Sequence, residues 1–277
     1  MTKEPNSRGR RFTKMHGLRN HFVIVDGRED SFSPSRNEIV RICDPAIGVG
    51  ADELIIVEQS ESGADVFMRI LNGDGREVEA CGNALRCVAW LLFEESGKDD
   101  VVVETLAGQL ACRRVGDMQV RAAMGKISMD WQSIPLAEEC DTLHMGISSG
   151  ALEDPVALNV GNPHAVFFVN NIDDMDMQSD APAIQGNDLF PNGVNVTAAQ
   201  IINGRKLRSI VYERGAGLTM ACGSAACAAV FAARRRGLTD ATEVEVELPG
   251  GIVRIEIQED DTAMMTGPVA YSFRGQF

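Results

Sequence analysis

Short apolar runs separated by turn residues dominate both halves of the chain. Runs such as HFVIVDG, ELIIVE and VVVETLAG in the first half, and KLRSIVYERG, EVEVELPGG and IVRIEIQ in the second, are rich in β-branched residues and bounded by Gly, Asn, Asp or Pro, which is typical of strands. The strongest helix candidates are residues 83–95 and 224–236, each directly after a Cys-Gly step. The pattern predicts mostly antiparallel sheets, each wrapped around one central helix.

The two helix candidates begin with similar sequences, ACGNALRCVAW at residues 80–90 and ACGSAACAAVF at 221–231. The similarity extends upstream, because polar residues recur at matching distances before Cys81 and Cys222. Asn72 and Glu213 lie nine residues before them, Glu53 and Asn195 lie 28 and 27 before, and Asn20 and Asn162 lie 61 and 60 before. These three pairs of polar residues and the cysteine pair itself recur in register, which indicates an internal duplication with a period of about 141 residues.

The duplication predicts an α+β fold of two pseudo-symmetric domains. The first is expected to span residues 1–126, with 1–11 disordered, and the second residues 127–265. The tail at 266–277 is left over after the second repeat, and we expect it to return as a strand to the first domain. A chain of 277 residues is longer than one core usually supports.

Composition narrows the class of partner. A net charge of −14 from 26 basic and 40 acidic residues would repel a phosphate backbone, so we expect no nucleic-acid partner. The basic cluster RGRRFTK is not followed by the apolar segment of a signal peptide, and no apolar run approaches a membrane span. We therefore expect a cytoplasmic protein without a membrane partner.

Seven cysteines, an odd number in a chain of this size, indicate free thiols in a reducing compartment. No CxxC pair occurs, and the four histidines do not cluster with cysteines at ligand spacing, so we expect no metal site. Cys81 and Cys222 stand at predicted helix N-termini, where backbone N–H groups and the helix dipole favour a thiolate. Cys87 and Cys227 lie further along the same helices and are expected in the core.

Two thiols at helix ends suit racemisation if the repeats face one another about a pseudo-twofold axis. A base must remove the α-proton from one face of a stereocentre while an acid delivers a proton to the other, and a thiolate and thiol can exchange these roles. The helix ends would also bind a substrate carboxylate. The alternative is that both cysteines are caps or core residues of a duplicated fold without chemistry.

These residues resemble a known family, the diaminopimelate epimerases. The motifs that carry the resemblance are MHGLRNHFVIVDG (15–27), GVGADELIIVE (48–58), LNGDGREVEACGNALRC (71–87), VGNPHAVFFV (160–169), FPNGVNV (190–196) and YERGAGLTMACGSAACAA (212–229). They occur in family order and cover about residues 15–275.

The resemblance implies a homodimeric enzyme that needs neither pyridoxal phosphate nor metal and interconverts LL- and meso-diaminopimelate in bacterial lysine and peptidoglycan synthesis. It implies Cys81 and Cys222 as the acid and base, and His164 in a supporting role. Gly82, Asn83, Gly223 and Ser224 would hold the reacting carboxylate, and Glu213 the reacting ammonium. The remaining implied substrate-binding residues are Asn20, Glu53, Asn72, Asn162, Asn195 and Arg214, with Arg214 suited to bidentate capture of a distal carboxylate.

The chain departs from the usual family pattern at Arg19 and His21, at Glu53, where Gln is frequent, at Ala84 and at Leu218. The nearest rival reading is a proline or hydroxyproline racemase of the same fold, although its first Cys-Gly is usually followed by His rather than by Asn83. An isomerase of the PhzF type normally lacks the cysteine pair. A rival interpretation from another functional class is a non-catalytic thiol redox protein.

Overall fold

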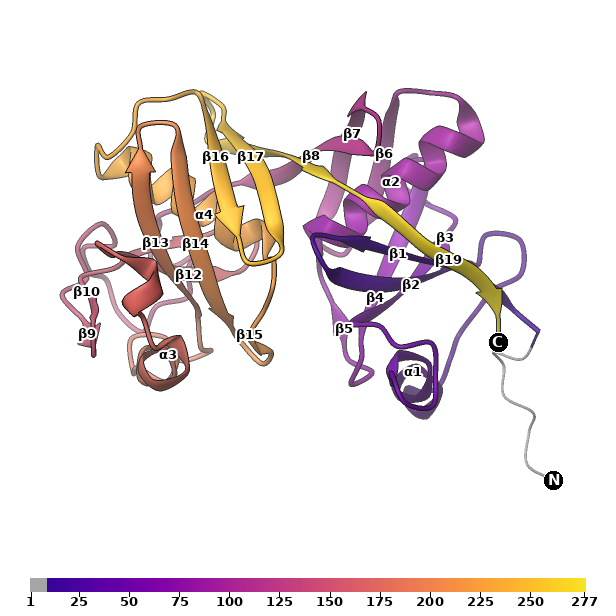
Figure 1. Ribbon diagram of the computed structural model, residues 1–277, viewed down its shortest axis with the longest axis horizontal. Helices are drawn as coiled ribbons and strands as arrows, with labels where there is room; N and C mark the ends of the chain where they lie inside the picture. The colour runs from indigo at the N-terminus through magenta and orange to yellow at the C-terminus, as the bar shows by residue number, and fades with distance from the viewer. Residues whose placement is uncertain (1–8) are drawn as a thin grey trace. The chain divides into compact units, whose positions relative to one another are not determined.

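The computed structural model describes residues 9–277, which divide into two compact units. Unit 1 is the described chain up to Ala122 together with Gly267–Phe277, and unit 2 is Ala123–Thr266. The chain passes from one unit to the other within strand β8 (Gln119–Lys126) and again within strand β18 (Thr262–Pro268) (Figure 1). Unit 2 is therefore one continuous segment, and unit 1 is assembled from two.

Unit 1 is a twisted sheet around one long helix. Its elements are β1 (Arg11–Gly17), β2 (Asn20–Asp26), α1 (Arg36–Cys43), β3 (Glu53–Glu58), β4 (Val66–Asn72), β5 (Glu77–Val78), α2 (Gly82–Ser96), β6 (Asp100–Thr105), β7 (Gly108–Gly116), β8 and β19 (Ala270–Gln276). The strands pair in the order β19-β1-β2-β3-β4-β6-β7-β8, with β5 beside β4. The pairs β2/β3 and β4/β6 are parallel, and the other pairs are antiparallel.

Unit 2 repeats this plan. Its elements are β9 (Ser148–Ser149), β10 (Leu152–Glu153), β11 (Val156–Asn159), β12 (Pro163–Phe168), the 3-10 helix η1 (Ile172–Asp174), α3 (Met177–Gln185), β13 (Asn195–Asn203), β14 (Lys206–Glu213), β15 (Gly217–Leu218), α4 (Gly223–Arg235), β16 (Glu243–Leu248), β17 (Gly251–Ile257) and β18. The main strands pair in the order β11-β12-β13-β14-β16-β17-β18, again with two parallel pairs, β12/β13 and β14/β16. The predicted α+β fold of two similar halves is confirmed.

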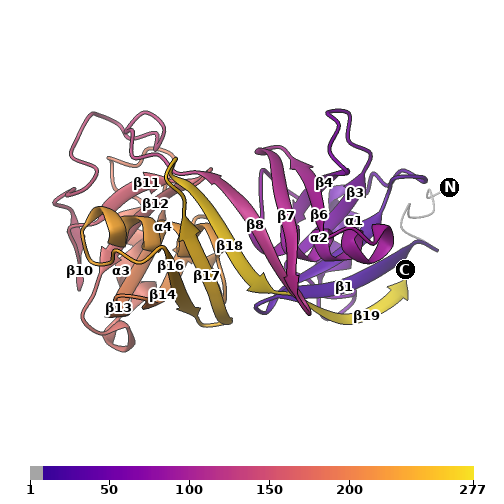
Figure 2. The ribbon, with the colours of Figure 1, turned by 90° about the horizontal axis from the view of Figure 1, so that it is seen from above.

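The central helices α2 and α4 are mostly apolar around their circumference, which explains their position. Ten of the fifteen residues of α2 and ten of the thirteen of α4 are buried, and a helix without a polar face must be enclosed. Helix α2 packs on β1, β6 and β7, and α4 on β11, β12 and β17 (Figure 2). Helix α2 ends at Gly97, whose φ of 70° is a left-handed cap. Enclosure fixes the N-terminal end of each helix, where the thiols lie.

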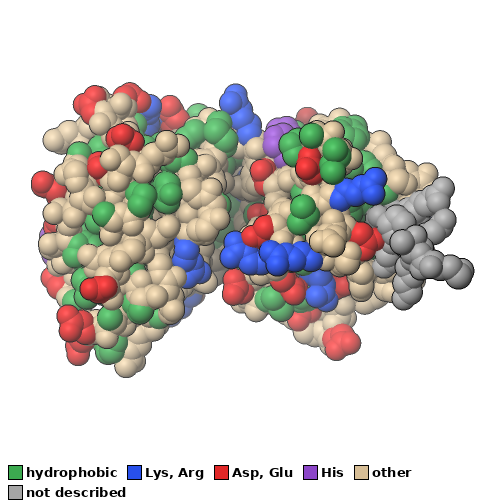
Figure 3. Space-filling view, turned by 90° about the horizontal axis from the view of Figure 1, so that it is seen from below, with side chains coloured by type: hydrophobic (Ala, Val, Ile, Leu, Met, Phe, Trp, Pro, Cys, Tyr) green, Lys and Arg blue, Asp and Glu red, His purple; other side chains and the backbone are tan. Residues whose placement is uncertain are grey.

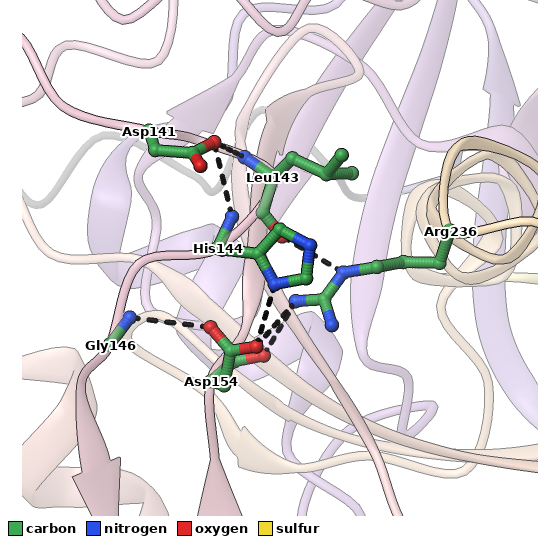
Figure 4. Close-up of polar contacts among 6 residues, drawn as sticks. All are labelled: Asp141, Leu143, His144, Gly146, Asp154 and Arg236. Atoms are coloured by element: carbon green, nitrogen blue, oxygen red, sulfur yellow. Dashed lines mark hydrogen bonds and ion pairs between the residues drawn. The ribbon is translucent and has the colours of Figure 1, made fainter.

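The C-terminal end of α4 is held by a polar network (Figure 4). Arg236 donates from Nε to the carbonyl of Leu143 at 2.9 Å and from Nη2 to the carbonyl of Asp154 at 2.8 Å. The Asp154 carboxylate accepts a second bond from Arg236 at 3.1 Å and lies 2.9 Å from Nδ1 of His144. The loop before β11 is thereby tied to the C-terminal end of α4.

Three sequence expectations need correction. Disorder was predicted for residues 1–11; residues 1–8 lie outside the described part, but Gly9 to Arg11 are ordered, because Gly9 N–H donates to the Phe277 carbonyl and Arg11 begins β1. Helices α1 and α3 were missed. Helix α1 had a readable start, since Ser35 and Glu38 form a capping box.

Candidate functional site

The strand order of unit 1 gathers three polar side chains at one edge of its sheet. Strands β2 and β3 are parallel and begin with Asn20 and Glu53. Strand β4 runs antiparallel to β3 and ends at Asn72, which is paired directly with Glu53. The matching distances in the sequence therefore correspond to one place in the fold.

The thiol of Cys81 lies at this edge, at the N-cap of α2. Its thiol donates to Oδ1 of Asn20 at 3.7 Å, and after burial the charge of Glu53 is the next cause that raises the pKa of the thiol. The backbone N–H groups of Asn83 and Ala84 point at the sulfur. One of the two N–H groups that the resemblance assigns to a substrate carboxylate, that of Asn83, thus contacts the thiol here.

The side chain of Asn83 is committed to the protein rather than to the solvent. It is buried, donates from Nδ2 to Oδ1 of Asn20 at 3.2 Å, and accepts from Nη2 of Arg86 at 2.7 Å. Arg86 is fully buried and also donates to the carbonyl of Gly82 at 3.2 Å. Arg86 fixes the first turn of α2, a role that the sequence analysis did not assign to it.

Asn20 is held from its other side by Asp52, which the sequence analysis also missed. The Asp52 carboxylate accepts from Nδ2 of Asn20 at 3.1 Å and from the backbone N–H of His21 at 2.6 Å. The turn before Asn20 has φ values of 55° at Leu18 and 67° at Arg19. This left-handed turn explains why a small residue is usual at the position of Arg19, and it still presents Asn20 at the strand start.

Unit 2 builds the same edge from Asn162, Asn195 and Glu213. Asn162 precedes β12, Asn195 begins the parallel strand β13, and Glu213 ends β14 in the ladder position next to the Val196–Tyr212 pair. Cys222 is the N-cap of α4 and is 7% exposed. The two halves thus offer one thiol each, in equivalent positions of the fold.

The surroundings of Cys222 are a carboxylate and a hydroxyl. The sulfur lies 3.4 Å from Oγ of Ser224, and after burial the charge of Glu213 is the next cause that raises the pKa of the thiol. Glu213 accepts a bond from the Thr219 hydroxyl. Burial raises the pKa of the Glu213 carboxyl, against the smaller opposing effects of Thr219 and Cys222.

His164 joins Ser224 to Asn162. Its Nε2 lies 2.8 Å from Oδ1 of Asn162 and 3.1 Å from Oγ of Ser224. Burial, with Arg214 as a second cause, lowers the pKa of His164 to about 3. The imidazole is therefore neutral at physiological pH and orients its neighbours without carrying charge.

Arg214 differs from the other predicted binding residues because it is exposed. Its backbone N–H donates to Oδ1 of Asn195 at 2.8 Å, and its Nη1 donates to the carbonyl of Asn192 at 2.9 Å. Asn195 is 3% exposed, so its side chain holds the backbone of Arg214. The guanidinium keeps donors available at the surface of unit 2.

The predicted bias of the helix ends toward thiolate is outweighed at both sites. The pKa of Cys81 is raised well above its usual value by burial and by the charge of Glu53, which exceed the effect of the backbone N–H groups. Burial and Glu213 raise the pKa of Cys222 in the same way. Both thiols are thus protonated at neutral pH, and a carboxylate lies near each. Cys87 and Cys227 are fully buried, as expected.

Residues 9–277 contain no group of three or more His, Cys, Asp or Glu side chains that could hold a metal ion. None of their helices has the length and hydropathy of a transmembrane span. A cavity of about 350 Å³ in unit 1 is lined by residues that include Thr13, Arg28 and Glu95, and Cys81 is not among them.

Comparison with known sequences gives matches along nearly the whole chain. The family model described as diaminopimelate epimerase matches residues 12–129 and 156–272. A diaminopimelate epimerase of Rhodospirillum centenum is 45% identical over 268 residues, covering 96% of this chain and 92% of the relative. Another, of Erythrobacter litoralis, is 47% identical over 267 residues, covering 96% of each.

Solved structures share the architecture at low sequence identity. A hydroxyproline epimerase of Agrobacterium vitis, solved with bound trans-4-hydroxy-L-proline, matches with a TM-score of 0.71 at 14% identity, covering 99% of this chain and 93% of that one. A phenazine biosynthesis protein of the PhzF family from Bacillus anthracis matches with a TM-score of 0.64 at 16% identity, covering 98% and 99%. At such identities the likeness shows the fold alone.

Proposed function

Because the chain belongs to the diaminopimelate epimerase family, we propose that it interconverts LL- and meso-diaminopimelate in bacterial lysine and peptidoglycan synthesis. The observation that carries the proposal is the repeated arrangement of Cys81 and Cys222, each capping a buried helix beside one Glu and one Asn. Identity of 45% along nearly the full length of a relative of that name supports the substrate.

In the proposed reaction each of the two repeats, residues 1–126 completed by 266–277 and residues 127–265, contributes one thiol to the substrate. The thiolate of one cysteine takes the α-proton, and the thiol of the other donates its proton to the opposite face of the resulting carbanion. The first sulfur ends as a thiol and the second as a thiolate, so charge and protons balance and the roles are exchanged for the reverse reaction.

We propose that the amides and helix ends around the thiols bind the substrate. The reacting carboxylate would take N–H bonds at the two helix ends, which develop more strength as charge forms in the transition state. Glu213, beside Cys222, would bind the reacting ammonium, and Arg214 the distal carboxylate. The full proposed set is Asn20, Glu53, Asn72, Gly82, Asn83, Asn162, Asn195, Glu213, Arg214, Gly223 and Ser224, with His164 in support.

The two thiols supply both acid and base, so we expect the reaction to proceed without pyridoxal phosphate or added metal. Thiols that serve one carbon atom from two sides are also close enough to oxidise to a disulfide. We therefore expect oxidant-treated enzyme to lose activity and to regain it with dithiothreitol. Full insensitivity to oxidation would contradict the arrangement.

The remaining expectations about partners and location follow from the family and the surface. We propose a cytoplasmic homodimer that acts on a small molecule and has no nucleic-acid or membrane partner. A net charge of −14 supports the exclusion of nucleic acid. Acidic side chains lie scattered over the face seen in Figure 3.

The test is deuterium incorporation at the α-carbon of LL-diaminopimelate in heavy water, with EDTA present and without added pyridoxal phosphate. We expect incorporation together with formation of the meso isomer. The same preparation should be assayed with L-proline and trans-4-hydroxy-L-proline. Faster racemisation of either compound than of diaminopimelate would favour the racemase alternative.

A further inference from the structure

The sulfur of Cys222 lies at the end of a short polar chain in unit 2. Nε2 of His164 is 2.8 Å from Oδ1 of Asn162 and 3.1 Å from Oγ of Ser224, and the same Oγ is 3.4 Å from the sulfur. A hydroxyl can donate as well as accept, so its direction in this chain depends on which nitrogen of the imidazole carries the proton. That direction decides whether the chain favours the thiol or the thiolate of Cys222.

The imidazole of His164 carries its proton on Nε2. The residue is fully buried, and burial first and Arg214 second lower its pKa to about 3, so the ring is neutral and has one N–H group. Its Nδ1 is buried and has no hydrogen-bond partner among the described residues. A proton on Nδ1 would be an unpaired buried donor, whereas a proton on Nε2 is accepted by Oδ1 of Asn162.

This tautomer sets the direction of the Ser224 hydroxyl. A protonated Nε2 has no lone pair to accept a hydrogen bond, so the hydroxyl oxygen accepts from Nε2 at 3.1 Å rather than donating to it. The O–H group is then left to donate to the sulfur of Cys222 at 3.4 Å. A donor that faces a sulfur stabilises the charged thiolate relative to the neutral thiol.

Cys81 meets the opposite polarity in unit 1. Its thiol donates to Oδ1 of Asn20 at 3.7 Å, and this oxygen also accepts from Nδ2 of Asn83 at 3.2 Å. Nδ2 of Asn20 donates to the Asp52 carboxylate at 3.1 Å, which holds the amide in this orientation. A carbonyl oxygen accepts but cannot donate, so it stabilises the thiol. Unit 1 thus presents an acceptor to its sulfur, and unit 2 presents a donor.

We propose that Ser224 is a positioning residue for Cys222: its hydroxyl donates to the sulfur and stabilises the thiolate, so that Cys222 loses its proton more readily than Cys81 does. The inference rests on the proposed function, because the two-thiol reaction needs a thiolate as its base. When Cys222 ionises, the S–H bond breaks, the proton passes to water and the electron pair stays on the sulfur. The Ser224 hydroxyl keeps its own proton throughout.

The other ionisable groups around Cys222 oppose its ionisation or carry no charge. Glu213 ends β14, and after burial its charge is the next cause that raises the pKa of Cys222. The bond to the Ser224 hydroxyl comes first among the causes that lower this pKa. His164 on β12 is neutral, and the guanidinium of Arg214, which follows β14, donates to a backbone carbonyl at the surface. Ser224 is therefore the side chain expected to favour the thiolate.

The test is the pH dependence of cysteine alkylation in the full-length reduced protein. Iodoacetamide reacts with thiolates, and mass spectrometry of the digested protein follows Cys81 and Cys222 in one sample, with fragment ions separating Cys222 from Cys227. The midpoint of Cys222 should lie below that of Cys81. Ser224→Ala should raise the Cys222 midpoint by about 1 pH unit, because the thiolate loses its donor, and should leave the Cys81 midpoint unchanged.

Two further variants separate the hydroxyl from a general effect on folding. Ser224→Thr keeps a hydroxyl and should keep the Cys222 midpoint within about 0.3 unit of the original. Ser209→Ala is the matched control, because Ser209 on β14 is also a serine of unit 2, is buried, and its Oγ has no hydrogen-bond partner among the described residues. It should leave both midpoints unchanged.

The direction of the polar chain can also be measured without any substitution. NMR of the nitrogen-labelled protein at neutral pH should place the imidazole proton of His164 on Nε2. A proton on Nδ1 would let Ser224 donate to the imidazole and would overturn the inference. A Cys222 midpoint that falls or stays in Ser224→Ala would overturn it as well, because a hydroxyl that accepts from the thiol raises the pKa of the thiol.

Failure of the inference and failure of the proposed function are distinguishable, because neither alkylation nor NMR needs turnover. If the Cys222 midpoint rose in Ser224→Ala but no epimerisation were found, the role of Ser224 at the sulfur would stand and the assigned reaction would fall. If epimerisation were found and the midpoint did not rise, the reaction would stand without this role of Ser224.

Discussion

The two halves of the molecule share a backbone plan and differ at the positions that surround the thiol. Two residues after Asn20, unit 1 has Phe22 on β2. At the equivalent position, two residues after Asn162, unit 2 has His164 on β12. The second residue after the helix-capping cysteine is Asn83 in unit 1 and Ser224 in unit 2. Unit 1 braces its helix start with Arg86, and the equivalent position of unit 2 is Cys227.

The difference shows that after a duplication the side chains around a site can change while the backbone elements that position the site stay the same. Strand order, helix start and thiol are kept, because together they hold the sulfur at a buried helix end. The supporting groups are exchanged: an amide network around Asn20 in unit 1, and an imidazole and hydroxyl in unit 2. A substrate with one reacting centre and one distal carboxylate needs two unlike halves, and Arg214 stands where unit 1 has Gly73.

The strongest test of the comparison is loss of either thiol. Cys81→Ser and Cys222→Ser should each lower epimerisation at least about 10³-fold, because each removes one of two obligatory proton carriers. Cys140→Ser, a partly exposed thiol elsewhere in unit 2, is the control and should keep full activity in a coupled assay. Retention of a tenth of the activity by either site variant would show that the halves are not equivalent.

Arg86 and Cys227 should differ sharply in their contribution to stability. Arg86→Ala should lower the free energy of unfolding by about 3 kcal/mol, since it opens a cavity and removes the donors to Asn83 and the Gly82 carbonyl. Cys227→Ala removes a single buried sulfur and should cost about 1 kcal/mol. Urea unfolding of both variants measures the difference, and equal losses would contradict the bracing role.

His164 should make unit 2 sensitive to acid. Its pKa of about 3 lies below the ordinary 6.5, so the unfolded chain binds the extra proton between these values and stability falls as pH drops through that window. Between pH 7 and pH 5 the loss from this group should be about 2 kcal/mol. His164→Phe, which copies Phe22, should remove that part of the slope in urea unfolding at the two pH values. If the pH dependence of stability were the same in His164→Phe, His164 would not be the cause of the acid sensitivity.

The smallest expected effect on stability concerns the turn before Asn20. Arg19 has φ of 67° in unit 1, and Gly161 has φ of 84° at the equivalent place in unit 2. Arg19→Gly should raise the free energy of unfolding by about 0.5–1 kcal/mol, because glycine has no Cβ to strain the left-handed turn. Gly161→Ala should have the opposite sign. Thermal unfolding measures both, and a destabilised Arg19→Gly would mean that the arginine side chain outweighs the strain.

Much of the plan was readable from the sequence because two signals are local. A thiol before Gly and an all-apolar stretch marked both central helices to within one residue of each end, and strand-type runs marked most of the sheet. The helices α1 and α3 were missed because each is short and weakly apolar. Pro182 also falls inside α3, and a proline is unusual in the interior of a helix.

The partners of the site residues could not be read from the sequence in the same way. Asp52 and Arg86 act through contacts that exist only once strands and helix are assembled. The net protonation of the thiols was also misjudged. A helix end is visible in a sequence, whereas the burial and the carboxylate that outweigh it depend on the folded surroundings.

The return of the C-terminal segment to unit 1 has a consequence for synthesis on the ribosome. Strand β19 pairs with β1, and Phe277 stacks on Phe12 near the start of the chain. Unit 2 emerges as one uninterrupted stretch and is available to fold while translation continues. Unit 1 begins to be synthesised first but is completed only when residues 267–277 leave the exit tunnel, so a translation product truncated before them lacks the closing strand of unit 1 even when unit 2 is whole.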